Sequence, residues 1–203
     1  MFKRIALMFA FALALFGCSS AYEQPAYSVS RAFEEFELRD YAPTIVAETA
    51  VPGDVESASD AGFRSLFDYI SGNNAGAQEI SMTAPVTTTP QKIAMTAPVT
   101  QQSRDGGIVM QFVMPKSFTL ATLPKPMDPA VALRTTPARR FAAIRYSGTS
   151  SQSLYDEQLA KLRAAMAREK LEAIGEPVWA RYDPPFTPWF LRRNEIMLEL
   201  KGG

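Results

Sequence analysis

The order strand pair, helix, strand pair occurs twice along this chain, and it restricts the fold more than any other feature of the sequence. The strand-like segments of the first half lie at 33–38 and 44–50 and, after a helix near 59–71, at 79–87, 93–100 and 108–114. Those of the second half lie at 131–135 and 140–146 and, after a helix that begins at Ser153, at 178–182 and 195–200. Because neighbouring strands can pair locally and only two helices cover them, we expect an antiparallel α+β sheet and not a parallel βαβ arrangement.

Each expected helix has one apolar stripe. The stripe of the first helix consists of Phe63, Leu66, Phe67 and Ile70, and that of the second consists of Tyr155, Leu159, Leu162 and Met166. Gly72 is expected to end the first helix, because glycine accepts the left-handed conformation that often follows a helix. In the second helix, Asp156 stands at a capping-box position, and Gly175 and Pro177 are the expected stop.

The amino-terminal segment is predicted to be a targeting sequence. Lys3 and Arg4 precede an unbroken apolar run at 5–16, which is shorter than the roughly 20 residues that a spanning helix needs. The run ends in Leu15-Phe16-Gly17-Cys18, which resembles the lipobox of bacterial lipoproteins, where the cysteine carries the lipid. The resemblance implies a protein of the bacterial cell envelope, anchored by lipid at Cys18 to the periplasmic face of the outer membrane.

These features divide the chain into three parts. We predict a lipoprotein signal peptide at 1–17, a lipidated tether at 18–30 and a single domain at 31–203. The alternative is a signal peptide that is cleaved elsewhere, for example after Ala21, with Cys18 as an ordinary apolar residue of that signal.

Composition excludes several classes of site. The 203 residues contain no histidine and one cysteine, so a Ser-His-Asp triad, a Cys-His dyad, a His-ligated metal and a thiolate zinc cage are all ruled out. We therefore expect no metal site that is built from these ligands. Lys plus Arg equal Asp plus Glu at 21 each, which gives no basic face for nucleic acid, so no nucleic-acid partner is expected.

A short repeat lies inside the first half. The segments 80–87 and 93–100 agree at seven of eight positions, at a shift of 13 residues. Both contain proline, which donates no ladder hydrogen bond, so each copy is expected at an edge or a bulge of the sheet. Met82 and Met95 are either core residues of two strands or part of a soft, polarizable surface that adapts to a flat apolar ligand.

Three motifs, in the same order along the chain, resemble the SOUL haem-binding protein family. They are the doubled segment just described, 69–74 (YISGNN) and 182–195 (YDPPFTPWFLRRNE). The resemblance covers residues 32–200. It implies a distorted eight-stranded antiparallel sheet or barrel with two helices and a pseudo-twofold repeat of two similar halves. The same architecture resembles the effector-binding domains of the gyrase-inhibitor-like group, which bind varied small molecules.

The resemblance also implies a ligand and a place for it. The ligand is haem or another tetrapyrrole, held non-covalently in a hydrophobic groove between the first helix and the last inter-strand loop. The residues placed there are Arg64, Phe67, Ile70, Phe186, Trp189, Arg192 and Arg193. Aromatic side chains would cover the porphyrin face and arginines would bind its carboxylates. The family's histidine ligand has no counterpart in this chain, and among the possible phenolate donors Tyr41, Tyr69, Tyr146 and Tyr182 the sequence does not choose.

Two other functions remain open from the sequence. A gyrase-inhibitor-like hydrolytic or binding domain would need a buried carboxylate beside a tyrosine, and Glu195, Glu37 and Tyr146 are the candidates. An envelope scaffold would hold a peptide or another lipid-like molecule in the same groove. We expect a binding protein and not an enzyme.

Overall fold

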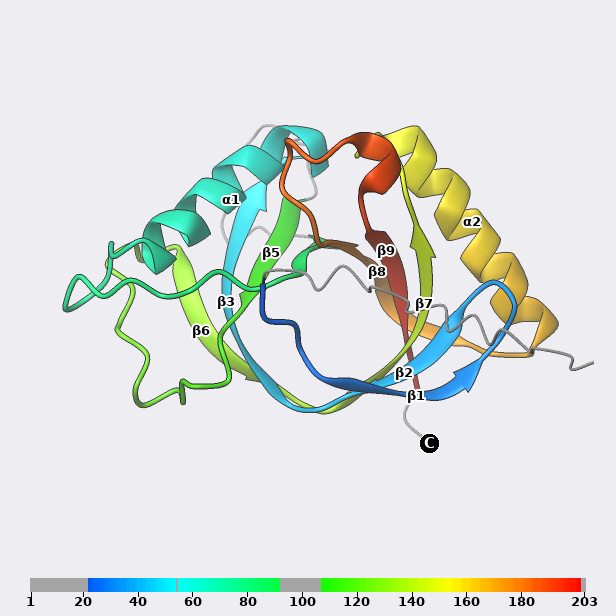
Figure 1. Cartoon of the computed structure of the whole chain (residues 1–203), viewed down its shortest axis with the longest axis horizontal. Helices are drawn as coiled ribbons and strands as arrows, with labels where there is room; N and C mark the ends of the chain where they lie inside the picture. The colour runs from blue at the N-terminus through cyan, green and yellow to red at the C-terminus, as the bar shows by residue number, and fades with distance from the viewer. Residues whose placement is uncertain (1–21, 54, 92–106, 202–203) are drawn as a thin grey trace, which may run out of the picture.

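The computed structural model describes residues 22–53, 55–91 and 107–201. Nine strands form one sheet, and two long helices lie against it (Figure 1). The strands are β1 (Tyr27–Ala32), β2 (Glu37–Tyr41), β3 (Thr44–Pro52), β4 (Val86–Gln91), β5 (Gly107–Val113), β6 (Val131–Thr136), β7 (Arg139–Tyr146), β8 (Ala173–Arg181) and β9 (Asn194–Leu200). The helices are α1 (Val55–Ile70), α2 (Gln152–Arg168) and the short 3-10 turn η1 (Trp189–Leu191). The predicted α+β class is confirmed.

The order of the strands shows the duplication directly. All pairs are antiparallel, and the order across the sheet is β1-β2-β7-β9-β8-β4-β5-β3-β6. Exchanging β2 to β5 with β6 to β9 reverses the order of these eight strands and leaves it otherwise unchanged. The exchange places the pseudo-twofold axis between β4 and β8, where Thr87 pairs with Ala180. The sheet has nine strands where eight were expected, because β1 adds to the edge of β2 outside the repeat.

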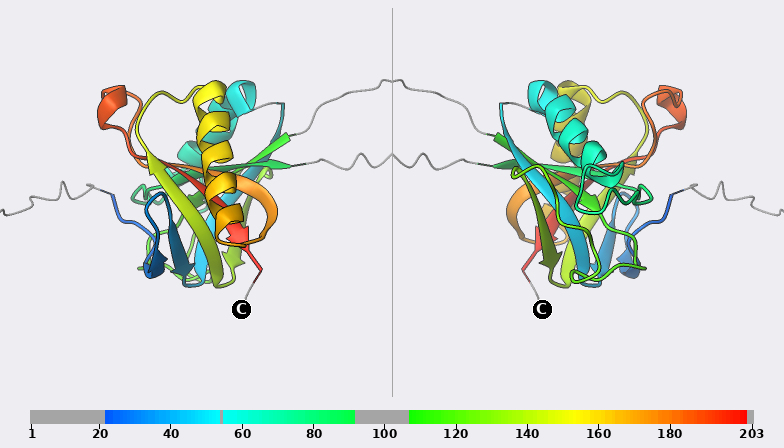
Figure 2. Two further views of the ribbon diagram at one scale, coloured as in Figure 1. Left: turned by 90° about the vertical axis from the view of Figure 1, so that its right-hand side faces the viewer. Right: turned by 90° about the vertical axis from the view of Figure 1, so that its left-hand side faces the viewer.

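Both helices lie on the same face of the curved sheet (Figure 2). Paired residues of neighbouring antiparallel strands point to the same side. One such row runs from Ile196 through Trp179 and Thr88 to Met110 and points to the side of the sheet that the helices cover. We call this side the helix face. The next row runs from Glu195 through Ala180 and Thr87 to Gln111 on the opposite side, which we call the open face.

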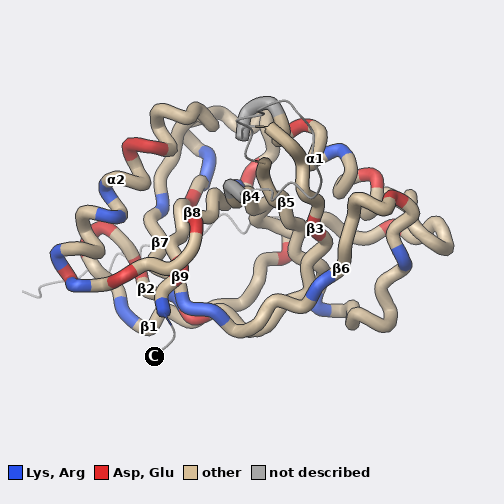
Figure 3. Tube along the Cα trace, turned by 180° about the vertical axis from the view of Figure 1, so that it is seen from behind, with Lys and Arg blue, Asp and Glu red and all other residues tan. Residues whose placement is uncertain are grey.

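The α2 half of the core matches the predicted stripe. Tyr155, Leu159, Leu162 and Met166 are all buried against β7 and β9. The charged residues of this helix, acidic near its start and basic further along, are all exposed (Figure 3), as expected for its solvent side. The predicted capping box does not form. The side chain of the N-cap residue Ser151 makes no capping bond, and Asp156 instead accepts a hydrogen bond from Gln152.

The α1 stripe differs from the prediction at two of its four positions. Leu66 and Ile70 are buried against β3 and β5, but Phe63 and Phe67 are 37% and 45% exposed. Tyr69 is buried in their place, at 1% exposure, and donates a hydrogen bond to the carbonyl of Pro124. Helical spacing allows a buried stripe that contains Phe63 and Phe67 or one that contains Tyr69, since both stripes lie on neighbouring parts of the same side of the helix. Gly72 follows the helix with φ +107°, as predicted for its stop.

Several boundaries differ from the sequence-based expectations. Of the expected strand at 33–38, residues 33–36 form the turn between β1 and β2, and only 37 and 38 lie in β2. Helix α2 ends at Arg168, so that Gly175 and Pro177 lie within β8. In the first repeat copy, only its last two residues, Val86 and Thr87, lie in a named strand, β4. The second copy lies outside the described residues. Within the part of the chain that the structure describes, neither helix is long and apolar enough to cross a bilayer.

Candidate functional site

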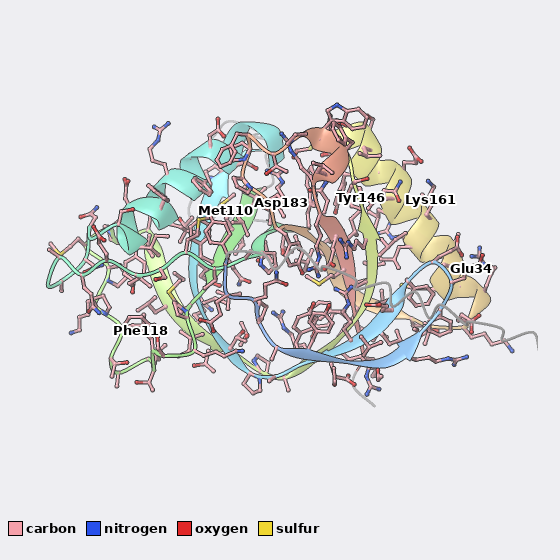
Figure 4. All side chains as sticks on the ribbon, in the orientation of Figure 1. Glu34, Met110, Phe118, Tyr146, Lys161 and Asp183 are labelled. Atoms are coloured by element: carbon pink, nitrogen blue, oxygen red, sulfur yellow. The ribbon has the colours of Figure 1, made fainter. Side chains whose placement is uncertain are left out.

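A groove opens on the helix face between α1 and the loop that joins β8 to β9. Its volume is about 300 Å³, at the lower end of the range for small-molecule sites. Ser59, Asp60 and Phe63 of α1 form one wall, and the opposite wall is formed by Asp183, Pro184, Pro185 and Arg192 of the loop. The remaining lining includes Met82, Ala84, Val86, Met110 and Arg181. We call this the helix groove. Met110, Asp183 and Tyr146 follow one another across this region between the helices (Figure 4).

Arg181 is the cation at the base of the helix groove. It follows Trp179 on the helix face of β8, and its guanidinium carbon lies 4.2 Å from the centre of the Trp179 ring. Its Nε is buried without a hydrogen-bond partner, and the guanidinium makes no ion pair with any residue in the described ranges. Burial lowers the pKa of Arg181, yet arginine keeps its charge in proteins. An unpaired charge in a partly desolvated place favours an anionic ligand.

Three further polar atoms near Arg181 are buried without a hydrogen bond. They are the hydroxyls of Tyr146 and Tyr155 and the indole nitrogen of Trp179. The Tyr155 and Trp179 rings lie 4.8 Å apart, and α2 covers them. Burial raises the pKa of Tyr146 to about 12, although Trp179 and the charge of Arg181 act in the opposite direction. The tyrosine is therefore neutral at ordinary pH, and its O–H group, which lies near the indole N–H of Trp179, makes no hydrogen bond of ordinary geometry.

This difference between tyrosines predicts the outcome of a matched pair of substitutions. Tyr69→Phe removes a hydrogen bond of 2.9 Å to Pro124 and should cost about 1 kcal/mol of unfolding free energy. Tyr146→Phe removes a hydroxyl that has no partner, and the unfolding free energy should stay within about 0.5 kcal/mol of the starting protein or rise. Urea titration measures both values. Equal losses in the two variants would contradict the assignment of the Tyr146 hydroxyl as unpaired.

The two consecutive arginines of the loop have different roles. Arg192 lines the helix groove and braces the loop, because its Nε donates to the carbonyl of Thr187 at 2.8 Å and its Nη2 donates to that of Pro185. Arg193 turns toward the open face, where it lies 3.8 Å from the centre of the Tyr182 ring and donates two hydrogen bonds to Glu195.

Glu195 is the centre of a buried ion cluster. Its Oε2 accepts from Arg39 and from the Tyr182 hydroxyl, each at 2.7 Å, and its Oε1 accepts from Arg193 at 2.8 and 3.0 Å. Burial opposes the charge of Arg39, but the carboxylate outweighs this effect and raises the pKa of Arg39. Glu37 supplies a second carboxylate to Arg39 at 2.8 Å. With four donors on Glu195, the carboxylate has no lone pair left to act as a base toward a substrate.

The other predicted site residues lie in three different surroundings. Ile70 packs in the core, Arg64 is exposed on α1, and Phe67 is partly exposed and stacks on Phe63 at 5.8 Å. Phe186 and Trp189 project into solvent from the β8–β9 loop. The structure thus brings Arg192 to the helix groove and places Phe186 and Trp189 on the tip of the loop that forms one of its walls.

A second cavity, of about 360 Å³, lies on the open face. Its apolar lining includes Tyr41, Phe141, Val178 and Met197. Its charged pair is Arg139 and Glu199, at 3.7 Å, and each is about 30% exposed. Although this cavity is the larger one, its arginine already has a carboxylate partner. The helix groove, with the unpaired Arg181, is therefore the better candidate for an anionic ligand.

Sequence reasoning overlooked Arg181, Phe63 and Met110. Arg181 precedes the motif at 182–195 by one residue. Because residues two apart on a strand point to the same face, its position two residues after Trp179 was a signal that could have placed it on the covered face. Phe63 was assigned to the core because helical spacing cannot separate a buried position from one at the rim of a groove.

Comparison with solved structures shows the same fold in proteins of distant sequence. The C-terminal domain of EcmrR matches with a TM-score of 0.59 and 11% identity, over 87% of this chain and 99% of that one. A structure described as a hydrolase from Listeria innocua matches with a TM-score of 0.54 and 10% identity, over 85% of this chain and 94% of the other. At these identities the likeness concerns the fold alone.

Comparison of sequences finds relatives of higher identity and a family match. Heme-binding protein 2 of Mus musculus is 28% identical over 176 residues, which are 82% of each protein. The Homo sapiens protein of the same name is 28% identical over 170 residues, covering 82% of this chain and 78% of the human protein. The profile of the family described as SOUL heme-binding protein matches residues 22–199, which include both helices and all nine strands except the last residue of β9. The chain belongs to the SOUL heme-binding protein family.

Proposed function

We propose that this protein binds haem or another tetrapyrrole in the helix groove, without a histidine ligand. The observation that carries the proposal is the unpaired guanidinium of Arg181 at the base of an apolar groove. Membership of the family and the name of the two relatives, Heme-binding protein 2, support the class of ligand.

The residues of the groove fit the two chemical parts of a porphyrin. Its face is broad and apolar, and Phe63, Met82 and Met110 offer a ring and two polarizable thioethers for contact. Its carboxylates need cationic donors, and Arg181 and Arg192 both line the groove. Arg181 forms no ion pair in the described part of the chain and its Nε has no hydrogen-bond partner, although the charge of Asp60 in the same groove acts on its pKa, whereas Arg192 already donates to two carbonyls of its own loop. We assign the first carboxylate to Arg181.

In this proposal, coordination of iron by side chains of the protein contributes little to the affinity. The chain has no histidine, and of the four tyrosines considered as donors only Tyr182 lines the groove. Its hydroxyl donates to Glu195, and burial together with the negative charge of Glu195 raises its pKa, which disfavours the phenolate that iron would need. Affinity would then come from the apolar face and the carboxylates, and the iron would add little.

The proposed location is the cell envelope. The apolar run at 5–16 and Cys18 lie outside the described residues, and the lipobox resemblance supports a lipid anchor there. In this proposal the protein holds, buffers or passes on its ligand at a membrane surface and does not transform it. The four hydrogen bonds on Glu195 argue against a hydrolytic role for that carboxylate.

The test is a parallel titration of hemin and metal-free protoporphyrin IX into protein that starts after Cys18. We expect a saturable change in the Soret band for both compounds, with dissociation constants within about tenfold of each other, that is about 1.4 kcal/mol. No saturable change with either compound would refute tetrapyrrole binding. Saturation with hemin alone would show that iron coordination carries the affinity, against the proposal. Native mass spectrometry of the protein from its own membrane then identifies the ligand that co-purifies.

A further inference from the structure

The tip of the β8–β9 loop carries four large apolar side chains that face solvent. Phe186 is 84% exposed, Leu191 66%, Trp189 59% and Phe190 57%, all within six residues. The other exposed large apolar residues in the described ranges are spread over several elements. Exposure of single apolar residues is common on soluble proteins, but a contiguous set of this kind marks an interaction surface. We call these four residues the apolar tip.

The loop holds the apolar tip away from the body of the protein through its own backbone. Arg192 donates to the carbonyls of Thr187 and Pro185, and the amide of Gly148 donates to the carbonyl of Trp189 at 3.0 Å. The η1 turn adds the hydrogen bond from Leu191 to Pro188 at 2.9 Å. A loop that is braced in this way pays little further ordering cost when its tip is buried in a partner.

The chemistry of the apolar tip fits the interfacial layer of a bilayer. Tryptophan and phenylalanine are favoured there, and Trp189 packs edge-on against Phe190 at 5.5 Å, so that the two rings present one apolar unit. Arg192 follows the tip directly in the sequence and places a positive charge next to it, although its guanidinium donates to carbonyls of the loop. No acidic residue occurs between Pro184 and Arg193 to oppose an anionic surface.

The start of the described chain lies on the same side of the molecule. Tyr22 lines the helix groove together with Pro184 and Pro185 of the loop. Figure 2 shows the segment that begins at Tyr22 and the η1 turn projecting from the same side. Tyr22 lies four positions after Cys18 in the sequence, a separation that spans at most about 14 Å when extended. A lipid on Cys18 would therefore bring the bilayer close to the apolar tip.

We propose that the apolar tip inserts into the interfacial layer of a phospholipid bilayer and holds the mouth of the helix groove against it. This inference rests on the lipid anchor of the proposed function and goes beyond it, because it fixes which face of the domain meets the membrane. An apolar ligand then moves between bilayer and groove without crossing bulk water.

The test uses the two tryptophans of the chain, Trp189 on the tip and Trp179, which is 3% exposed in the core. The full-length lipidated protein is reconstituted into phosphatidylcholine–phosphatidylglycerol vesicles with brominated acyl chains, in the absence of haem. We expect quenching and a blue shift of the Trp189 emission. The Trp189→Phe variant reports Trp179 alone and should show neither effect.

A matched control places the reporter at the other end of β8. Ile174, 42% exposed, is replaced by Trp in the Trp189→Phe protein and should stay unquenched. If the protein floats with the vesicles while Trp189 stays unquenched, the insertion of the tip is overturned but the lipid anchor is not. Protein that does not float overturns both the anchor and the insertion. Equal quenching at 174 and 189 overturns the orientation. The porphyrin titration is independent of all three results.

Discussion

Replacement of Glu195 by glutamine should lower the unfolding free energy by about 3–5 kcal/mol, the largest effect expected for a single isosteric substitution in this protein. The carboxylate is fully buried between Arg39 and Arg193 and accepts hydrogen bonds from both. Without its charge, two desolvated guanidiniums face each other across the open face with only the half-exposed Glu37 nearby. The measurement is urea unfolding followed by circular dichroism.

The matched control is Glu199→Gln, four residues further along the same strand. Glu199 also faces an arginine, Arg139 at 3.7 Å, but both side chains are about 30% exposed, so the loss should stay below about 1 kcal/mol. A loss of that small size in Glu195→Gln would show that water reaches the cluster and that the buried network does not hold β2, β8 and β9 together.

Replacement of Arg181 by methionine should weaken porphyrin binding by about 10- to 100-fold. The guanidinium is expected to make a charge-assisted hydrogen bond to a ligand carboxylate, worth about 1.5–3 kcal/mol, and methionine keeps the apolar packing against Trp179. The same substitution removes an unpaired, partly desolvated charge from the unliganded protein, so the unfolding free energy should stay equal or rise. Soret titration and urea unfolding measure the two effects separately.

Opposite signs in these two measurements separate a binding residue from a structural one. A structural role for Arg181 would lower stability and binding together. Arg163→Met provides the control, because Arg163 is exposed on α2 and does not line the groove, and it should change neither quantity. Unchanged binding in the Arg181 variant would contradict this assignment and favour the open-face cavity, whose lining includes the Arg139–Glu199 pair.

The repeated order of elements was enough to predict the fold class, because local strand pairing and two amphipathic helices leave few topologies. The prediction was most accurate for α2, whose four stripe residues are all buried. It was least accurate for α1, where Tyr69 and not Phe67 faces the core. Helical periodicity identifies the apolar side of a helix. How much of that side the sheet buries depends on the curvature of the sheet.

The candidate site shows the same division. The motif at 182–195 includes the loop and the Arg192 that line the helix groove, and this groove lies between α1 and that loop, the two elements that the family resemblance named. The sequence could not distinguish Arg192, which braces its own loop, from Arg193, which pairs with Glu195, since the two are adjacent and identical in type. Only the register of β8 against β9 sends one to the helix face and the other to the open face.

By itself, the sequence determined the duplication, the two helices, the α+β class and the absence of histidine, because periodicity and composition are local properties of the chain. The tertiary structure decided which charges are paired. Glu195 lies 156 residues from Arg39 along the chain and 2.7 Å from it in space, whereas Arg181 meets no described carboxylate within ion-pair distance. Such pairing depends on contacts between distant segments, and it leaves the buried Arg181 without an ion-pair partner among the described residues.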